Sequence, residues 1–145
     1  MKKLGSESLA DLSAGAVFLA TGGGGDPYVA ELITKAALDK FGPVDLLDPD
    51  DLDDDAFVVA LSLELLPSIN DAVDTLRAFE DHFGKKIDAV VSFEIGGANS
   101  LIPIIAAAGM GIPVVNGDGM GRALPEAQMM TYPIFGVLPT PAVTT

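Results

Sequence analysis

Short apolar runs alternate along the chain with longer segments in which apolar residues recur every three or four positions. Runs of this length indicate buried strands, and the periodic segments indicate amphipathic helices. The alternation predicts repeated strand-loop-helix units, and therefore an open, mostly parallel α/β sheet with flanking helices. The predicted strands are 16–20, 44–47, 56–63, 87–93 and 113–115, and the predicted helices are 6–12, 28–40, 68–83 and 99–110.

Single residues mark the ends of several of these elements. Asp26 is predicted to cap a helix whose first residue is Pro27, because proline lacks the N–H that the first helical turn leaves unbonded. Gly84 fits a helix C-cap. Pro103 is compatible with a helix only in its first turn. The acidic segment 48–55 carries too much charge to be buried, so it is predicted to be an exposed loop.

Composition narrows the class of protein. The 145 residues are enough for one domain, 1–145, and nearly half of them are hydrophobic. No apolar stretch is long enough to span a membrane and no signal-type segment opens the chain, so we expect a cytoplasmic protein with no membrane partner. The net charge of −13 argues against nucleic acid as a partner.

The numbers of cysteine and histidine residues exclude several kinds of chemistry. The chain has no cysteine and one histidine, His82, so disulfides, thiolate nucleophiles and two-histidine metal centres are absent. His82 follows Asp81 near a predicted helix end, where an exposed capping histidine is the ordinary interpretation. The residues imply no particular cofactor, and a role for metal is left open.

Three unusual loops are predicted to follow strands. Ligands of parallel sheets bind outside the carboxyl ends of the strands, so this shared placement is the main functional argument. The first loop is a run of glycines ahead of Asp26. Its backbone N–H groups could donate hydrogen bonds to an anion or to a polarised carbonyl. It matches neither a dinucleotide fingerprint nor a phosphate-binding P-loop, and a simple tight turn is the structural alternative. Its candidate ligand-binding residues are Gly22, Gly23, Gly24, Gly25 and Asp26.

The second loop places Glu94 at the end of a buried strand, beside Gly96, Gly97 and Asn99. A carboxylate that faces backbone donors and a side-chain amide is a candidate general acid or base. The glycines and Asn99 are candidate substrate contacts. The structural alternative is a helix capped by Asn99 with a solvated Glu94.

The third loop combines charges of both signs in a glycine-rich stretch. Asp118 and Glu126 are candidate catalytic carboxylates, and Arg122 could clamp an anionic group or form a purely structural ion pair. Asn116 and Met120 are candidate substrate contacts. Asp118 and Glu126 with Glu94 could instead hold a divalent metal through oxygen ligands, although their spacing matches no established metal loop.

With these residues the chain resembles the N-terminal domain of the S-methyl thiohydantoin desulfurase family, formerly a domain of unknown function associated with hydantoinases. The resemblance rests on three ordered motifs, ATGGGGDP at 20–27, EIGGAN at 94–99 and DGMGRALPE at 118–126, and runs almost end to end. The family pattern has aspartate where Asn116 stands. The resemblance implies an α/β domain that the family joins to a β-rich C-terminal domain, and an activity on thiohydantoin or hydantoin-like rings.

Two functions of different classes follow. The first is a hydrolase-like domain that removes methanethiol from an S-methylthiohydantoin, with Glu94 or Asp118 activating water, the glycine amides stabilising oxyanion charge and Arg122 orienting the substrate. The second is a non-catalytic small-molecule-binding or protein-interaction module; nucleotide binding is a weaker third. The methionines late in the chain are typical of a partner surface, so we expect a homo-oligomer or a complementing C-terminal domain.

Overall fold

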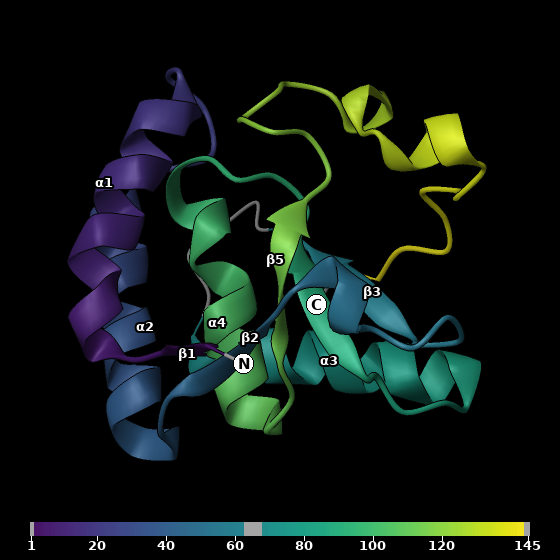
Figure 1. The fold of residues 1–145 in the computed structure, drawn as a ribbon, viewed down its shortest axis with the longest axis horizontal. Helices are drawn as coiled ribbons and strands as arrows, with labels where there is room; N and C mark the ends of the chain where they lie inside the picture. Colours follow the sequence, from purple (N-terminus) through teal and green to yellow (C-terminus); the bar gives the residue numbers. More distant parts are fainter. Residues whose placement is uncertain (1, 63–67, 144–145) are drawn as a thin grey trace.

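The structure, a computed structural model, describes residues 2–62 and 68–143, which form one five-stranded sheet with helices packed against it (Figure 1). The strand order is β1-β2-β5-β4-β3, with β1 antiparallel to β2 and the other pairs parallel. The predicted mostly parallel α/β architecture is therefore confirmed. The strands are β1 (Lys2–Leu4), β2 (Val44–Leu47), β3 (Val58–Leu61), β4 (Ala89–Ser92) and β5 (Val114–Asp118). The helices are α1 (Leu9–Ala20), α2 (Pro27–Phe41), α3 (Ile69–Phe83) and α4 (Ile102–Met110).

The main hydrophobic core lies between the helices and one face of the sheet. It contains Leu9 of α1 and buried residues of α2, α3 and α4, together with strand residues of alternate positions such as Val59 and Leu61. Alternate residues of a strand point to opposite faces, so these side chains all face the helical layer. The centre of this layer is α4, which packs against both α2 and α3. Its residues from Ile102 to Ala108 are all buried.

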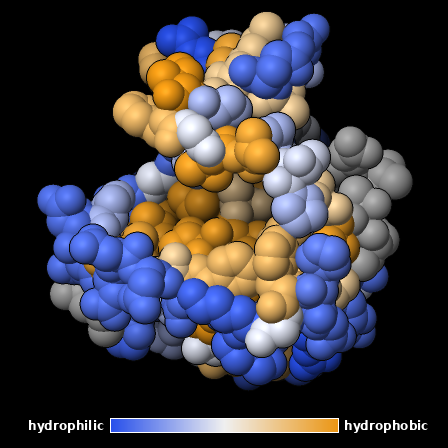
Figure 2. Space-filling view, turned by 90° about the vertical axis from the view of Figure 1, so that its right-hand side faces the viewer, coloured by the Kyte–Doolittle hydropathy of each residue, from blue (hydrophilic) through white to orange (hydrophobic). Residues whose placement is uncertain are grey.

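The opposite face of the sheet carries a smaller apolar cluster. Ala89, Val91 and Val115 are buried there, and the residues that pack over them include Leu52 from the acidic loop and Tyr132 from the C-terminal segment. Figure 2 shows a hollow with largely apolar walls on this side of the molecule, below the C-terminal segment that Figure 1 places at the upper right. The sheet therefore has one face under helices and one face under loops.

The predicted strand 16–20 is wrong, because these residues form the second half of α1. The buried residues of α1 are Leu9, Ser13 and Ala16, a helical spacing, whereas Phe18 is 83% exposed. The apolar run 16–20 is compatible with a strand as well, because periodicity cannot separate a short apolar run from a helix segment. Gly15 does not interrupt the helix, since an isolated glycine costs only about 1 kcal/mol there.

The first strand is instead β1, which the apolar pattern did not indicate. Its residues pair antiparallel with β2, Lys3 opposite Asp45, and the two side chains form an ion pair of 2.9 Å. Two of its three residues are exposed, so an edge strand this short and polar leaves no apolar run. The last residue of the predicted strand 56–63, residue 63, lies outside the described residues. Strand β5 continues to Asp118, beyond the predicted end at residue 115, so Asn116 is a strand residue.

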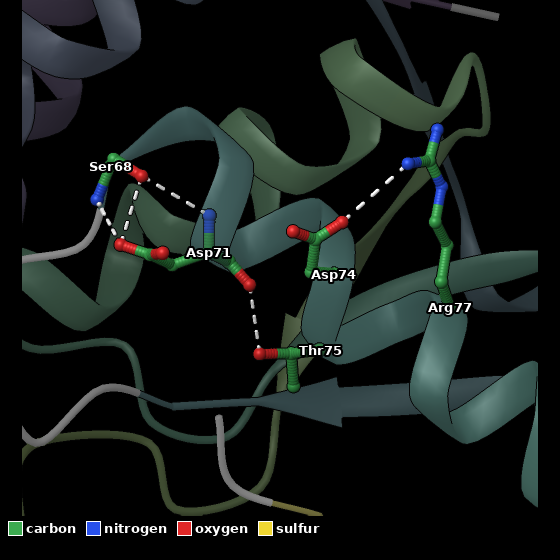
Figure 3. A network of polar contacts seen from close by, with 5 residues as sticks. All are labelled: Ser68, Asp71, Asp74, Thr75 and Arg77. Carbon is green, nitrogen blue, oxygen red and sulfur yellow. Dashed lines mark hydrogen bonds and ion pairs between the residues drawn. The ribbon is translucent and has the colours of Figure 1, made fainter.

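Side-chain hydrogen bonds cap the N-terminus of helix α3 (Figure 3). The Asp71 amide donates to Ser68 Oγ at 3.2 Å and the Ser68 amide donates to Asp71 Oδ2 at 2.8 Å, which is a reciprocal capping box. Further along, Thr75 Oγ1 donates to the Asp71 carbonyl, and Arg77 lies 3.5 Å from Asp74. Gly84 ends the helix with φ 62°, as predicted.

Candidate functional site

The four glycines form a turn between two helices rather than a loop after a strand. Helix α1 ends at Ala20, Thr21 takes the left-handed conformation with φ 48°, and the Gly23 amide donates to the Ala20 carbonyl at 2.8 Å. Positive φ occurs at Gly22, Gly24 and Gly25. Residues other than glycine rarely adopt such φ values, so the glycines allow the sharp change of direction between α1 and α2. The predicted position of this loop at a strand end is therefore wrong.

Asp26 caps α2 as predicted. Its Oδ1 accepts a hydrogen bond from the Tyr28 amide at 2.9 Å, and Pro27 is the first helical residue. The cap occupies one carboxylate oxygen of an exposed side chain. Contact between Asp26 and a ligand stays a prediction.

The glycine turn lies directly against the loop that follows β4. The Ala98 amide donates to the Gly25 carbonyl and the Asn99 amide donates to the Gly24 carbonyl, both at 3.3 Å. The two backbones are so close that a Cβ built on Gly24 would overlap the Gly96 carbonyl oxygen. The structure therefore brings the first and second predicted loops together, by backbone contacts that only glycine permits.

Glu94 is buried between these loops and is fully engaged. It is 6% exposed, and its Oε1 accepts a hydrogen bond from Asn99 Nδ2 at 2.6 Å. Its Oε2 accepts from the Leu124 amide at 3.0 Å. Asn99 lies in a 3-10 turn, Gly97–Ser100, ahead of α4, so it is not the cap of that helix. Glu94 thus joins the second loop to the third.

Asp118 ends β5 and organises the start of the third loop. Its Oδ2 accepts hydrogen bonds from three backbone amides: Ile95 at 3.0 Å, Met120 at 3.1 Å and Gly121 at 2.6 Å. Burial raises the pKa of Tyr132 above its usual value, and the negative charge of Asp118 raises it further. Asp118 is half-buried, so unlike Glu94 it keeps some access to solvent.

The other polar residues of the third loop are exposed. Arg122 forms no ion pair with any residue of 2–62 or 68–143, and Glu126 accepts a hydrogen bond from the Gln128 side chain. The side chain of Asn116 is also exposed. Within the same described ranges no three histidine, aspartate or glutamate side chains are grouped to hold a metal ion. Catalytic roles for Arg122 and Glu126 and substrate contact by Asn116 stay predictions.

An open depression of about 500 Å³ lies between the glycine turn and the third loop. The Ala123 amide donates to the Leu19 carbonyl at 3.2 Å and holds the third loop against the end of α1. We call this depression the glycine cavity; it is lined by Thr21, Gly22, Gly23, Gly24, Arg122, Ala123, Leu124 and Pro125. A smaller depression of about 200 Å³ near the N-terminal ends of β2 and β5 contains none of the candidate residues.

Three residues that support the site were not among the candidates. Ser92 Oγ donates to the Glu94 carbonyl at 2.5 Å and contacts the Asn99 carbonyl, so it fixes the second loop. Ala123 is buried against Gly96, and Tyr132 packs beside Asp118. A serine at a strand end and an alanine in a loop carry no distinctive chemical signal. Only the tertiary arrangement indicates their roles.

Fold and site together define an α/β domain with an open, glycine-lined cavity beside two carboxylates that are held by amide donors. The chain belongs to the S-Me-THD-like family: residues 7–145 match the model of that family's N-terminal domain, which confirms the predicted resemblance.

Among solved structures, the crystal structure of a protein from Chromobacterium violaceum is similar to this chain, with a TM-score of 0.78 and 27% sequence identity. The alignment covers 97% of this chain and 41% of that protein, so the chain spans less than half the length of its structural relative. No curated protein matches the chain. Among the described residues no helix is long and apolar enough to cross a bilayer.

Proposed function

We propose that this domain binds a flat, five-membered imide-like ring of the hydantoin, thiohydantoin or S-methylthiohydantoin class in the glycine cavity, and that it takes part in hydrolysis at that ring. The observation that carries the proposal is the meeting of the first and third candidate loops at a cavity that has Arg122 on its wall, with the second loop hydrogen-bonded to both. Its volume of about 500 Å³ falls within the roughly 300–1,000 Å³ of small-molecule sites.

The cavity wall offers hydrogen-bond donors that suit such a ring. The guanidinium of Arg122 is a planar donor for ring carbonyls or an anionic substituent. Within residues 2–62 and 68–143, the backbone amide of Gly24, which lines the cavity, has no acceptor. An amide without a protein acceptor can stabilise negative charge as it develops on a ring oxygen or nitrogen.

The proposed reaction is hydrolysis of the ring's methylthio group. Water adds through its oxygen to the C=N carbon that bears the sulfur, and one water proton goes to the ring nitrogen. The carbon–sulfur bond then breaks, the second proton leaves with the sulfur as methanethiol, and the hydantoin carbonyl forms. Asp118 is the better placed of the two carboxylates to accept the proton from water, because its Oδ1 accepts no hydrogen bond from the described residues.

The test is calorimetric titration of the chain with hydantoin, 2-thiohydantoin and S-methylthiohydantoin, followed by an assay of methanethiol release. The chain has no cysteine, so a thiol reagent reports methanethiol alone. Loss of a charged hydrogen bond predicts that Arg122→Ala weakens binding about 10- to 100-fold. Arg77→Ala is the matched control, since Arg77 is exposed on α3 and pairs with Asp74. Equal binding by wild type and Arg122→Ala would contradict the proposal.

A second candidate, a protein-interaction module, is favoured by the C-terminal segment. Four of its large apolar side chains are exposed: Ile134, Phe135, Val137 and Leu138, at 78%, 82%, 55% and 75%. Adjacent exposed apolar side chains of this number are typical of a contact surface. Self-association by light scattering that is lost on Phe135→Ser, with no ring binding, would favour this function over the first.

A further inference from the structure

We propose that Glu94 is a positioning residue, a buried clasp that holds the two walls of the glycine cavity in register, and that it does not transfer protons. The inference rests on the proposed function, because it assigns Glu94 a role in the site where the ring would bind. It departs from the interpretation of Glu94 as a general acid or base that the sequence suggested.

The clasp is a continuous chain of hydrogen bonds from one wall of the cavity to the other. On one side, the Asn99 backbone amide donates to the carbonyl of Gly24, which lines the cavity. The Asn99 side chain donates to Glu94 Oε1 at 2.6 Å. On the other side, Glu94 Oε2 accepts from the amide of Leu124, which lines the opposite wall. Glu94 and Asn99 thus connect two cavity walls that come from distant parts of the chain.

The chemistry of the partners calls for a group that only accepts hydrogen bonds. Both partners of Glu94 are N–H donors, and a carboxylate offers two oxygens that accept without carrying a proton. An amide in the same place would turn one donor toward another donor and leave a buried group without its hydrogen bond. The position therefore selects a carboxylate on structural grounds.

The position of Glu94 is also unsuited to proton transfer. A general acid or base must lie within hydrogen-bond reach of the reacting group or of one water molecule. Glu94 is 6% exposed and has both oxygens engaged by protein donors, whereas Asp118 is half-buried. Ser92 adds to the fixation by donating to the Glu94 carbonyl, so the residue is held at both backbone and side chain.

An exchange of the acid and the amide separates the two roles. Glu94→Gln removes one acceptor and breaks one link of the clasp. In the double variant Glu94→Gln/Asn99→Asp, the glutamine introduced at position 94 can accept from the Leu124 amide through its oxygen and donate through its nitrogen to the new carboxylate at position 99. The double variant therefore rebuilds the clasp with the carboxylate moved to the other residue.

Three measurements are made on wild type and both variants: amide hydrogen exchange at Leu124, affinity for S-methylthiohydantoin, and turnover. For Glu94→Gln we expect Leu124 exchange to rise about tenfold and affinity to fall about tenfold, as the loss of one buried hydrogen bond implies. For the double variant we expect exchange, affinity and turnover to return to within about threefold of wild type.

If the variants fold, two results would overturn the clasp: unchanged Leu124 exchange in Glu94→Gln, or a double variant that regains exchange protection and affinity but has no turnover. The hydrogen-exchange measurement needs no ligand, so absence of ring binding by wild type would refute the proposed function while the clasp is still judged by Leu124. If Glu94→Gln does not fold, a folded double variant supports the clasp and an unfolded one overturns it.

Discussion

Gly24 and Gly97 lie with their backbones in contact, which joins the turn after α1 to the loop after β4. A Cβ built on Gly97 would lie 2.6 Å from the carbonyl carbon of Gly24, and one built on Gly24 would overlap the oxygen of Gly96. Both glycines have positive φ, 74° and 59°. This contact sets how closely one wall of the cavity approaches the second loop.

Gly24→Ala should therefore destabilise the protein more than other glycine substitutions in the same turn. We expect a loss of about 2 to 4 kcal/mol in the free energy of unfolding, because left-handed strain and a backbone clash add together. Urea denaturation monitored by circular dichroism measures the change.

Gly22→Ala is the matched control. Gly22 has φ 93° but no atom within 4 Å of a built Cβ, so its substitution introduces strain without a clash. We expect about 1 to 2 kcal/mol for it. Equal losses at both positions would show that close packing at Gly24 contributes nothing.

Asp118→Ala should loosen the third loop. The substitution leaves three backbone amides without the oxygen they share, and we expect a loss of about 2 to 4 kcal/mol. Asp118→Asn keeps one side-chain oxygen and should lose less. Chemical denaturation of both variants gives the difference; an alanine variant as stable as the asparagine variant would contradict the shared-acceptor role.

Tyr132 should ionise at higher pH than a free tyrosine. Burial is the larger cause of its raised pKa and the Asp118 charge is the smaller one. Ionisation is therefore more difficult in the folded state, and the stability that this contributes is fully present below the unfolded-state pKa of about 10. It is lost as the pH rises through the higher folded-state pKa, because the unfolded chain releases this proton more readily. Tyr28→Phe leaves Tyr132 as the one tyrosine, and absorbance titration measures it.

In that background Asp118→Asn should lower the Tyr132 pKa without returning it to the usual value, because burial remains. A titration midpoint that does not move would show that the carboxylate charge is not felt at Tyr132.

Glu80 should make stability fall in acid. Its hydrogen bonds with Lys86 Nζ, 2.6 Å, and with the Ile87 amide, 3.0 Å, lower the pKa of this carboxyl. The contribution is therefore fully present above the unfolded-state pKa, about 4.3, and is lost as the pH falls through the lower folded pKa. Glu80→Gln should cost about 1 to 2 kcal/mol at pH 7 and flatten this part of the pH dependence.

Unfolding free energies of wild type and Glu80→Gln are compared between pH 7 and pH 3. Asp54→Asn in the exposed acidic loop is the control, and it should leave the stability at pH 7 unchanged. The same acid slope in wild type and Glu80→Gln would contradict the assignment.

Local chemistry explains which elements could be predicted. Asp26 and Pro27 start α2, Ser68 and Gly84 bound α3, and Pro103 stands in the first turn of α4, because each of these effects acts within one helical turn. The run 16–20 could not be assigned in this way, since its apolar residues satisfy either pattern locally. Phe18 is exposed on a helix, and nothing within a few residues of it indicates that.

The candidate site was predicted in part for the same reason. The glycine run and the residue types of the second and third loops identified the segments that meet, although the glycine turn follows a helix and not a strand. The hydrogen-bond partners of the two Glu94 oxygens could not be predicted from neighbouring residues in the sequence. Asn99 and Leu124 lie 5 and 30 positions from Glu94, and no sequence spacing links the three.

By itself the sequence determined the helices with strong caps, the parallel-strand segments, the exposed acidic loop and the three segments of the candidate site, because turn chemistry and hydrophobic periodicity are local. Only the tertiary structure decided that residues 16–20 belong to α1 and not to a strand, that β1 is an edge strand of the sheet, and that Glu94 is buried between two donors instead of solvated. These outcomes depend on packing between segments that are distant in the sequence. Burial and close contact between backbones determine them, and residue type alone does not.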